Sequence, residues 1–202
     1  MRNACAGKGS KEKRVENFRA LLPRFTPPVF HLWFQSQFAD AYSWAMAKRN
    51  FTRTSAAYSM LGYILGLGDR HSENLLLNPA TGEVVQVDFN CLFNHGEDFI
   101  VPETVPFRLT HNMISAMGLL GFEGQFRYTA EDVLFLLRQY RKLFAANVNI
   151  FLYDPLQEWL AAGDRGELVS ALSPFALSHI RSTVGFTIFI STCSAKRQCL
   201  AL

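Results

Sequence analysis

The sequence predicts a mainly α-helical domain that carries one small β-hairpin. Several segments repeat apolar residues at helical spacing, whereas two short apolar runs, 75–77 and 84–87, have the length of strands. A turn containing Pro79 and Gly82 separates these two runs, which is typical of a hairpin. Hydrophobic residues make up 49% of the chain and charged residues 18%, a composition that can bury a core.

The expected helices follow from start and stop signals in the sequence. Pro27-Pro28 suits the first turn of a helix, and Gly66 and Gly68 end a later one. Thr129 is expected to cap another, since the acidic Asp132 follows three residues on. The expected helices are, in chain order, 29–38, 41–48, 54–67, 108–117, 129–144 with an extension toward 151, and 156–160. Residues 89–106 lack periodicity and are expected to form a loop.

Aromatic residues at helical spacing are expected to supply much of the core. These residues are Trp33, Phe34, Trp44, Phe135 and Phe144. Basic residues do not interleave them, which argues against a surface that stacks nucleic-acid bases.

Charge and cysteine usage narrow the class of protein further. The net charge of +3 is too small to indicate nucleic-acid binding, and none is expected. The four cysteines are widely spaced without a CxxC motif, which argues against a disulfide framework or a zinc site. Residues 1–17 are basic without an apolar core, so they do not resemble a secretory signal and are expected to be disordered. The apolar run 183–193 is too short to span a bilayer, so no membrane partner is expected.

A glycine-led break before the hairpin gathers polar residues, and an acid returns after it. The break reads Gly-Leu-Gly-Asp-Arg-His-Ser-Glu-Asn over 66–74, and the acid is Asp88. A turn centred on Thr81 would place Asn74 opposite Asp88. Opposed residues in a hairpin have Cβ atoms about 5 Å apart. Because Mg²⁺ prefers oxygen ligands and needs few from the protein, Asn74 and Asp88 are predicted to hold a metal ion.

The same residues suit a phosphoryl-transfer site, which needs a metal and a group that orients the attacking hydroxyl. Asp69 is expected to accept or orient the hydroxyl proton, and His71 to assist it or to contact phosphate. Arg70 is assigned to the catalytic loop, where it tethers the loop or pairs with an acid. Taken singly, Asp69 would fit a helix cap, His71 a packed core histidine and Asp88 the end of a strand. Their convergence through one hairpin favours a site.

Two motifs, GDRHSEN (68–74) and VDFN (87–90), resemble the catalytic and metal-binding motifs of the phosphatidylinositol-3-kinase-related protein kinases. The order Asp-Arg-His, instead of the His-Arg-Asp of ordinary protein kinases, is that of this family and of lipid kinases. Asp-Phe-Asn in place of Asp-Phe-Gly is similar to the ATR-type checkpoint branch. The stretches LLPRFTPPVFHLWF, VPETVPFRLTHNM and FLYDPLQEW extend the resemblance. It assigns residues 18–161 to the C-terminal lobe of the kinase domain and leaves 162–202 as a divergent tail.

The resemblance implies an ATP- and Mg²⁺-dependent kinase acting on Ser or Thr of protein substrates, with Gln following in the ATR-type branch. It implies that Leu76 and Val87 line the adenine pocket and that residues 89–110 form the activation loop. It also implies checkpoint signalling in the nucleus with an ATR-type binding partner. The N-terminal lobe, with its phosphate-covering loop and lysine, is missing from this sequence. The isolated chain is therefore expected to have little or no kinase activity.

Other functions remain open at this stage. Lipid kinases of the related class tend to carry a basic cluster in the activation loop, but residues 89–106 contain three acidic residues and no Lys or Arg, which favours a protein substrate. A non-catalytic interaction module could keep the lobe without the reaction. A metal-dependent phosphoesterase built from Asp69, His71, Asp88 and His111 would need two metals, and the sequence supplies ligands for one.

Overall fold

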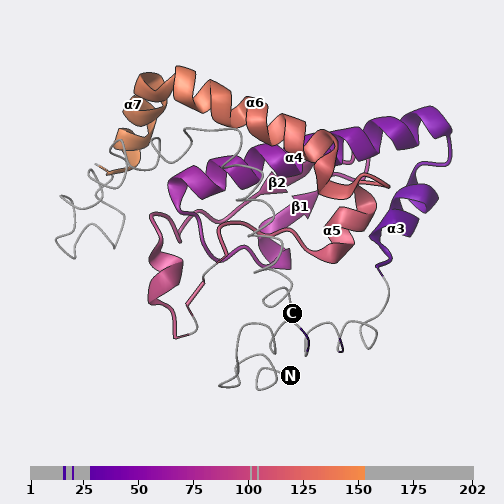
Figure 1. Ribbon diagram of the computed structural model, residues 1–202, viewed down its shortest axis with the longest axis horizontal. Helices are drawn as coiled ribbons and strands as arrows, with labels where there is room; N and C mark the ends of the chain where they lie inside the picture. The colour runs from indigo at the N-terminus through magenta and orange to yellow at the C-terminus, as the bar shows by residue number, and fades with distance from the viewer. Residues whose placement is uncertain (1–15, 17–19, 21–27, 101, 104, 153–202) are drawn as a thin grey trace.

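The computed structural model describes residues 16, 20, 28–100, 102–103 and 105–152, and Figure 1 shows how they are arranged. The expected helix at 156–160 and the tail at 162–202 lie outside the described residues, as does the N-terminal segment apart from residue 16. The longer helices are α3 (Phe30–Gln37), α4 (Ala41–Leu65), α5 (His111–Ala116), α6 (Gln125–Gln139) and α7 (Arg141–Leu152). Short 3-10 turns are η2 (Ser72–Asn74), η3 (His95–Asp98) and η4 (Gly121–Glu123), and the strands are β1 (Leu75–Leu77) and β2 (Val84–Gln86).

The mainly helical fold with one hairpin is confirmed. The strands β1 and β2 pair antiparallel, and they form the one sheet among the described residues. Figure 1 shows α6 running along α4, with α3 beside α5. Strand β2 packs against α4, so the long helix supports both α6 and the hairpin. Within the described part of the chain, no helix combines the length and hydrophobicity needed to cross a bilayer.

Helix α4 is continuous where the sequence predicted two helices, 41–48 and 54–67, and the prediction of a break was wrong. Asp40 caps its start, because the Asp40 carboxylate accepts from the N–H groups of Tyr42 and Ser43 at 3.0 and 2.8 Å. Phe51 is 1% exposed and lies in the segment expected to break. The hydroxyl of Thr52 there donates to the carbonyl of Lys48 at 2.8 Å, which satisfies it within the helix. Burial of this face therefore outweighs the weak helical propensity of the segment.

Helix α6 starts four residues before the expected cap, so the assignment of Thr129 as an N-cap was wrong. The helix begins at Gln125, after Gly124. Thr129 lies inside it, where its hydroxyl accepts from the side-chain amide of Gln125 at 3.0 Å. Phe126 and Ala130 are both fully buried, and they share one helical face only if the helix already includes 126. Tertiary burial thus sets the start of α6.

The core lies where α3, α4 and α6 meet. Its largest fully buried side chains are Phe34, Phe51, Phe126 and Met60. Trp33, Trp44 and Phe144 are partly buried and pack against this core, as expected. The expectation for Phe135 was wrong, because this residue is 61% exposed on α6.

Two phenylalanines on α6 provide a matched test of this core. We expect Phe126→Ala to lower the free energy of unfolding by about 3–5 kcal/mol, since it removes a fully buried ring and leaves a cavity. We expect Phe135→Ala to change it by less than about 1 kcal/mol, because that ring is largely in water. Urea unfolding of the 202-residue chain measures both values. Equal losses for the two variants would contradict the placement of α6.

The hairpin register differs by one residue from the prediction. The paired residues are Leu75 with Gln86, Leu76 with Val85 and Leu77 with Val84. Beyond them, the carbonyl of Asn74 accepts from the N–H of Val87 at 3.1 Å. Asn74 therefore lies opposite Val87 and not opposite Asp88, so the predicted direct pairing was wrong.

The turn explains the shift in register. Its loop has four residues, 79–82, and is closed by the N–H of Asn78, which donates to the carbonyl of Glu83 at 2.8 Å. The turn centre thus falls between Ala80 and Thr81 instead of on Thr81. Gly82 has a φ of +73°, and a Cβ there would lie 2.6 Å from the carbonyl oxygen of Ala47 on α4. Glycine lets the turn take this conformation and sit directly on the helix.

Candidate active site

The loop that carries Asp69 begins with a sharp turn at the end of α4. Gly66 has left-handed φ and ψ of 59° and 39°, and the N–H of Leu67 donates to the carbonyl of Gly62 at 2.8 Å. These features end the helix as the sequence predicted. Three residues later Asp69 is also left-handed, with a φ of 56°, a conformation that non-glycine residues rarely adopt. Two left-handed residues therefore lie three positions apart in this loop, and the carbonyl of Asp69 is bonded to Asn74 at the start of the hairpin.

Arg70 ties this loop to the end of the hairpin. Its Nε donates to the carbonyl of Gly68 at 2.8 Å, its Nη1 to the carbonyl of Val87 at 2.6 Å, and its Nη2 to the carbonyl of Asp88. The residue is 9% exposed. Burial lowers the pKa of the Arg70 guanidinium from its ordinary value, while the charges of Asp88 and Asp69 oppose that change. The guanidinium donates to backbone carbonyls, which corresponds to the tether, one of the two roles expected for Arg70.

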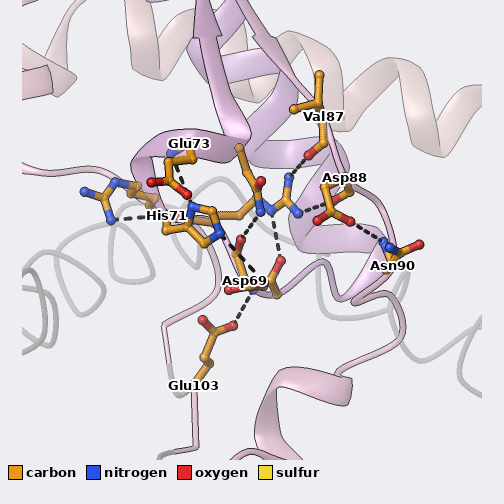
Figure 2. Close-up of polar contacts among 11 residues, drawn as sticks. Asp69, His71, Glu73, Val87, Asp88, Asn90 and Glu103 are labelled. Carbon is orange, nitrogen blue, oxygen red and sulfur yellow. Dashed lines mark hydrogen bonds and ion pairs between the residues drawn. The ribbon is translucent and has the colours of Figure 1, made fainter.

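Asp69 and His71 lie side by side and remain open to solvent. The Oδ2 of Asp69 is 3.9 Å from the Nε2 of His71, and the two side chains are 46% and 47% exposed. The N–H of Glu73 donates to the Nδ1 of His71 at 3.2 Å, so His71 also caps the turn η2. With Nδ1 acting as an acceptor, the neutral ring carries its proton on Nε2, on the side of Asp69. Figure 2 shows the His71 ring between Glu73 and Asp69.

Asn74 directly precedes β1 and Asp88 lies two residues after β2, so both are at the open end of the hairpin. Asn74 is 6% exposed, and its Nδ2 donates to the carbonyl of Asp69 at 2.8 Å, which leaves its Oδ1 available as a ligand. Asp88 is exposed and left-handed, with a φ of 60°, and its Oδ1 accepts from the N–H of Asn90 at 3.2 Å. One amide oxygen and one carboxylate oxygen fit a hard cation such as Mg²⁺, which keeps other positions for water and phosphate.

The described residues contain no group of three or more His, Cys, Asp or Glu side chains placed to hold a metal ion. The phosphoesterase alternative needs such a group from Asp69, His71, Asp88 and His111, all of which are described. The described residues therefore offer no site for the two metals that this alternative needs. His111 instead begins α5.

The corrected register gives the hairpin an apolar, exposed face. Leu76 and Val85 are paired and are 52% and 44% exposed. Val87 and Asn74 lie two pairs further along, on the same face as Leu76, because every second pair shares a face. Val84, on the other face, is buried against α4. Val85 lies opposite Leu76 only in the observed register. The sequence therefore did not predict Val85 as part of the face that includes Leu76 and Val87.

Residues of the segment expected to form the activation loop contact the loop that carries Asp69 at several points. The N–H of Gly68 donates to the carbonyl of Cys91 at 2.8 Å, and the N–H of Asp69 donates to the Oε2 of Glu103 at 2.8 Å. Figure 2 shows the Glu103 carboxylate directed at Asp69. Arg108 adds a bond from its Nη1 to the carbonyl of Arg70 at 3.4 Å. Glu103 and Arg108 were not predicted as site residues, because no local motif links them to a loop more than 30 residues away.

The thiol of Cys91 is buried beside Gly68 and near Glu103. Burial raises the pKa of the Cys91 thiol, and the nearby Glu103 carboxylate raises it further. We expect Cys91 to resist alkylation by iodoacetamide at neutral pH in the folded chain and to react after denaturation, since the thiolate is the reactive form. Peptide mass mapping would measure the two extents, and equal labelling before and after denaturation would contradict the packing of Cys91.

Known proteins are similar to this chain in sequence and in fold. A sequence profile described as phosphatidylinositol 3- and 4-kinase matches residues 4–161. The chain is 47% identical over 157 residues to the serine/threonine-protein kinase MEC1 of Candida albicans, covering 78% of this chain and 7% of that protein. It is 50% identical over 141 residues to the protein kinase rad3 of Schizosaccharomyces pombe, covering 70% and 6%. It is 52% identical over 145 residues to the serine/threonine-protein kinase ATR of Drosophila melanogaster, covering 72% and 6%.

A solved structure of the FAT and kinase domain of CtTel1 has the same fold. The TM-score is 0.75 at 33% identity, covering 97% of this chain and 14% of that one. The chain thus spans a small part of the relatives that it matches. The chain belongs to the phosphatidylinositol 3- and 4-kinase family, and within it to the phosphatidylinositol-3-kinase-related serine/threonine protein kinases.

Proposed function

We propose that this chain supplies the metal-binding and hydroxyl-orienting half of an ATP-dependent active site that phosphorylates Ser or Thr in proteins. The observation that carries the proposal is the junction organised by Arg70, which bonds to the carbonyls of Gly68, Val87 and Asp88. This junction fixes the Asp69 loop against the end of β2. The residues proposed for phosphoryl transfer are therefore held in place by the same set of hydrogen bonds.

Asp69 would accept or orient the proton of the attacking hydroxyl. Its carboxylate is half-exposed, so a substrate side chain can reach it. His71 would direct its Nε2–H toward the same space, where it can donate to Asp69 or to a phosphate oxygen. Arg70 is a positioning residue in this scheme, because its donors are occupied by backbone carbonyls.

Asn74 and Asp88 would hold Mg²⁺ through Oδ1 and a carboxylate oxygen. When bound, the metal supplies positive charge that neutralises the ATP phosphates during transfer. The bond from Asn74 to the carbonyl of Asp69 connects the expected metal ligand to the hydroxyl acceptor. The bond from Asn90 limits rotation of the Asp88 carboxylate.

Leu76, Val85 and Val87 would form the apolar floor under the adenine ring. Two of them are exposed on a hairpin face that no described element covers, as a nucleotide floor requires. A protein substrate is favoured over a phosphoinositide, because residues 89–106 of the activation loop carry no Lys or Arg. We further propose the specificity of the ATR-type branch, Ser or Thr followed by Gln, together with nuclear checkpoint signalling and an ATR-type binding partner, on the basis of similarity to MEC1, rad3 and ATR.

A graft tests this function directly, since the chain spans 6% of rad3. Residues 18–161 would replace the equivalent segment of Schizosaccharomyces pombe rad3, and the grafted kinase would be assayed with Mg²⁺-ATP and Ser-Gln and Ser-Ala peptides. We expect phosphorylation of the Ser-Gln peptide in preference to Ser-Ala.

Loss of one metal ligand provides the second arm of the test. Asp88→Asn in the graft should lower kcat by at least about 100-fold, because the metal contributes several kcal/mol of charge stabilisation. Asn is the suitable replacement, since it tolerates the left-handed φ of Asp88. The exposed Asp98→Asn is the control and should leave kcat unchanged. A folded graft without activity, or an Asp88→Asn graft with full activity, would refute the proposed function.

A further inference from the structure

We infer that Glu103 is a positioning residue that holds Asp69 in its working conformation, so that the order of the activation loop controls the hydroxyl acceptor. This inference rests on the function proposed above for Asp69. Glu103 lies 34 residues after Asp69, in the activation loop.

Both peptide groups that flank the Asp69 Cα are held by side chains from other segments. The N–H of Asp69 donates to the Oε2 of Glu103 at 2.8 Å, and the carbonyl of Asp69 accepts from the Nδ2 of Asn74 at 2.8 Å. Asp69 has a φ of 56°, which is unfavourable for an L-residue with a side chain. Such a conformation persists where the surroundings fix it. The dihedral angles φ and ψ set the directions of the N–H and the carbonyl of Asp69, and the two hydrogen bonds hold these two groups.

Two glycines make room for the Glu103 carboxylate. A Cβ at Gly68 would lie 2.6 Å from the Oε2 of Glu103, and a Cβ at Gly96 would lie 2.5 Å from the same atom. Neither Gly68 nor Gly96 has a positive φ, so the backbone conformation does not require glycine at either position. What the two glycines share is the close approach of the Glu103 carboxylate to the position of a Cβ. The carboxylate therefore sits in a space that exists because both residues lack side chains.

The backbone of Glu103 is held by a hydrogen bond within the expected activation loop. The N–H of Glu103 donates to the carbonyl of Gly96 at 2.9 Å, which holds the backbone of Glu103 beside Gly96. A displacement of the Glu103 backbone would withdraw the carboxylate from the N–H of Asp69. The expected activation loop and the residue proposed to orient the hydroxyl are thus joined by one hydrogen bond.

Four variants of the grafted kinase test the role of Glu103. We expect Glu103→Ala to lower kcat by about 10- to 100-fold with little change in the KM for ATP, the range for groups that orient a reacting side chain. Glu103→Gln should retain most of kcat, because its amide oxygen can still accept from the N–H of Asp69. Gly96→Ala should lower kcat like Glu103→Ala, since its new methyl group displaces the carboxylate. The exposed Glu97→Ala, which removes a charge from the same loop, should leave kcat unchanged.

The double variant Gly96→Ala/Glu103→Ala separates positioning from a general structural role. If Gly96 matters because it makes room for Glu103, the double variant should have the kcat of either single variant. Losses that multiply would overturn the inference. A rise in the peptide KM at constant kcat in Glu103→Ala would overturn it too, because that result indicates contact with substrate alone.

Amide hydrogen exchange in the ungrafted 202-residue chain gives a readout that does not depend on activity. We expect the N–H of Asp69 to exchange at least about tenfold faster in Glu103→Ala and in Gly96→Ala than in the wild type or Glu103→Gln, because it loses its acceptor. Unchanged exchange at Asp69 would overturn the inference. This measurement also separates the two proposals: an inactive wild-type graft would reject the proposed function, whereas the exchange data would still decide whether Glu103 holds Asp69.

Discussion

Asp69→Asn in the grafted kinase should lower kcat for peptide phosphorylation by about 10²–10⁴-fold, the usual contribution of a positioned group that handles a proton. Asparagine keeps the size of the side chain and tolerates the left-handed φ of 56°, so the loop should keep its conformation. The bonds from the Asp69 backbone to Glu103 and Asn74 are also retained. The loss should therefore come from the missing carboxylate charge and basicity.

The kinetic pattern distinguishes this role from structural damage. The KM for ATP should change little, because Asp69 is assigned to the hydroxyl and not to the nucleotide. Asp132→Asn, which removes an exposed carboxylate from α6, is the matched control and should be active. An Asp69→Asn graft with kcat within a factor of about three of the wild type would mean that another group handles the proton.

Arg70→Met should lower the free energy of unfolding of the 202-residue chain by roughly 2–4 kcal/mol, because three backbone carbonyls lose a charged donor in a buried place. Methionine keeps much of the apolar stem, so the change isolates the guanidinium. Arg70→Lys should recover part of this loss and no more, since one ammonium group cannot reproduce the planar fork that reaches Gly68, Val87 and Asp88 together.

Urea unfolding followed by tryptophan fluorescence would measure these differences. The exposed Arg53→Met on α4 is the control and should change stability by less than about 0.5 kcal/mol. Amide exchange at Asn90 should accelerate in Arg70→Met before global unfolding, because the end of β2 loses its tether. Equal unfolding midpoints for Arg70→Met and Arg53→Met would contradict the junction described for Arg70.

The sequence was informative wherever the structure depends on local chemistry. The glycine that ends α4, the paired apolar runs of the hairpin and the core position of Phe34 all follow from nearest neighbours and periodicity. Of the two roles expected for Arg70, a tether of the loop or a partner of an acid, its hydrogen bonds to the carbonyls of Gly68 and Val87 correspond to the tether.

The errors arose where distant packing or exact turn geometry decides the result. One residue in the turn decides the register, and the choice between a centre on Thr81 and one before it depends on how Gly82 packs against Ala47. Thr129 carries a valid cap signal, but the burial of Phe126 extends α6 past it. Glu103 has no signal near Asp69, because the hydrogen bond between them depends on the path of the whole activation loop.

The most direct test of the active-site assignment is whether Asn74 and Asp88 hold one divalent cation beside Asp69. Mn²⁺, which takes similar oxygen ligands to Mg²⁺, can be titrated with ATP into the isotopically labelled 202-residue chain while line broadening is followed by NMR. We predict that the resonances of Asn74, Asp88 and Asp69 broaden first and that Asp88→Asn removes this effect. Broadening that begins at the exposed acids Glu97 and Asp98, or that persists unchanged in Asp88→Asn, would contradict the assignment.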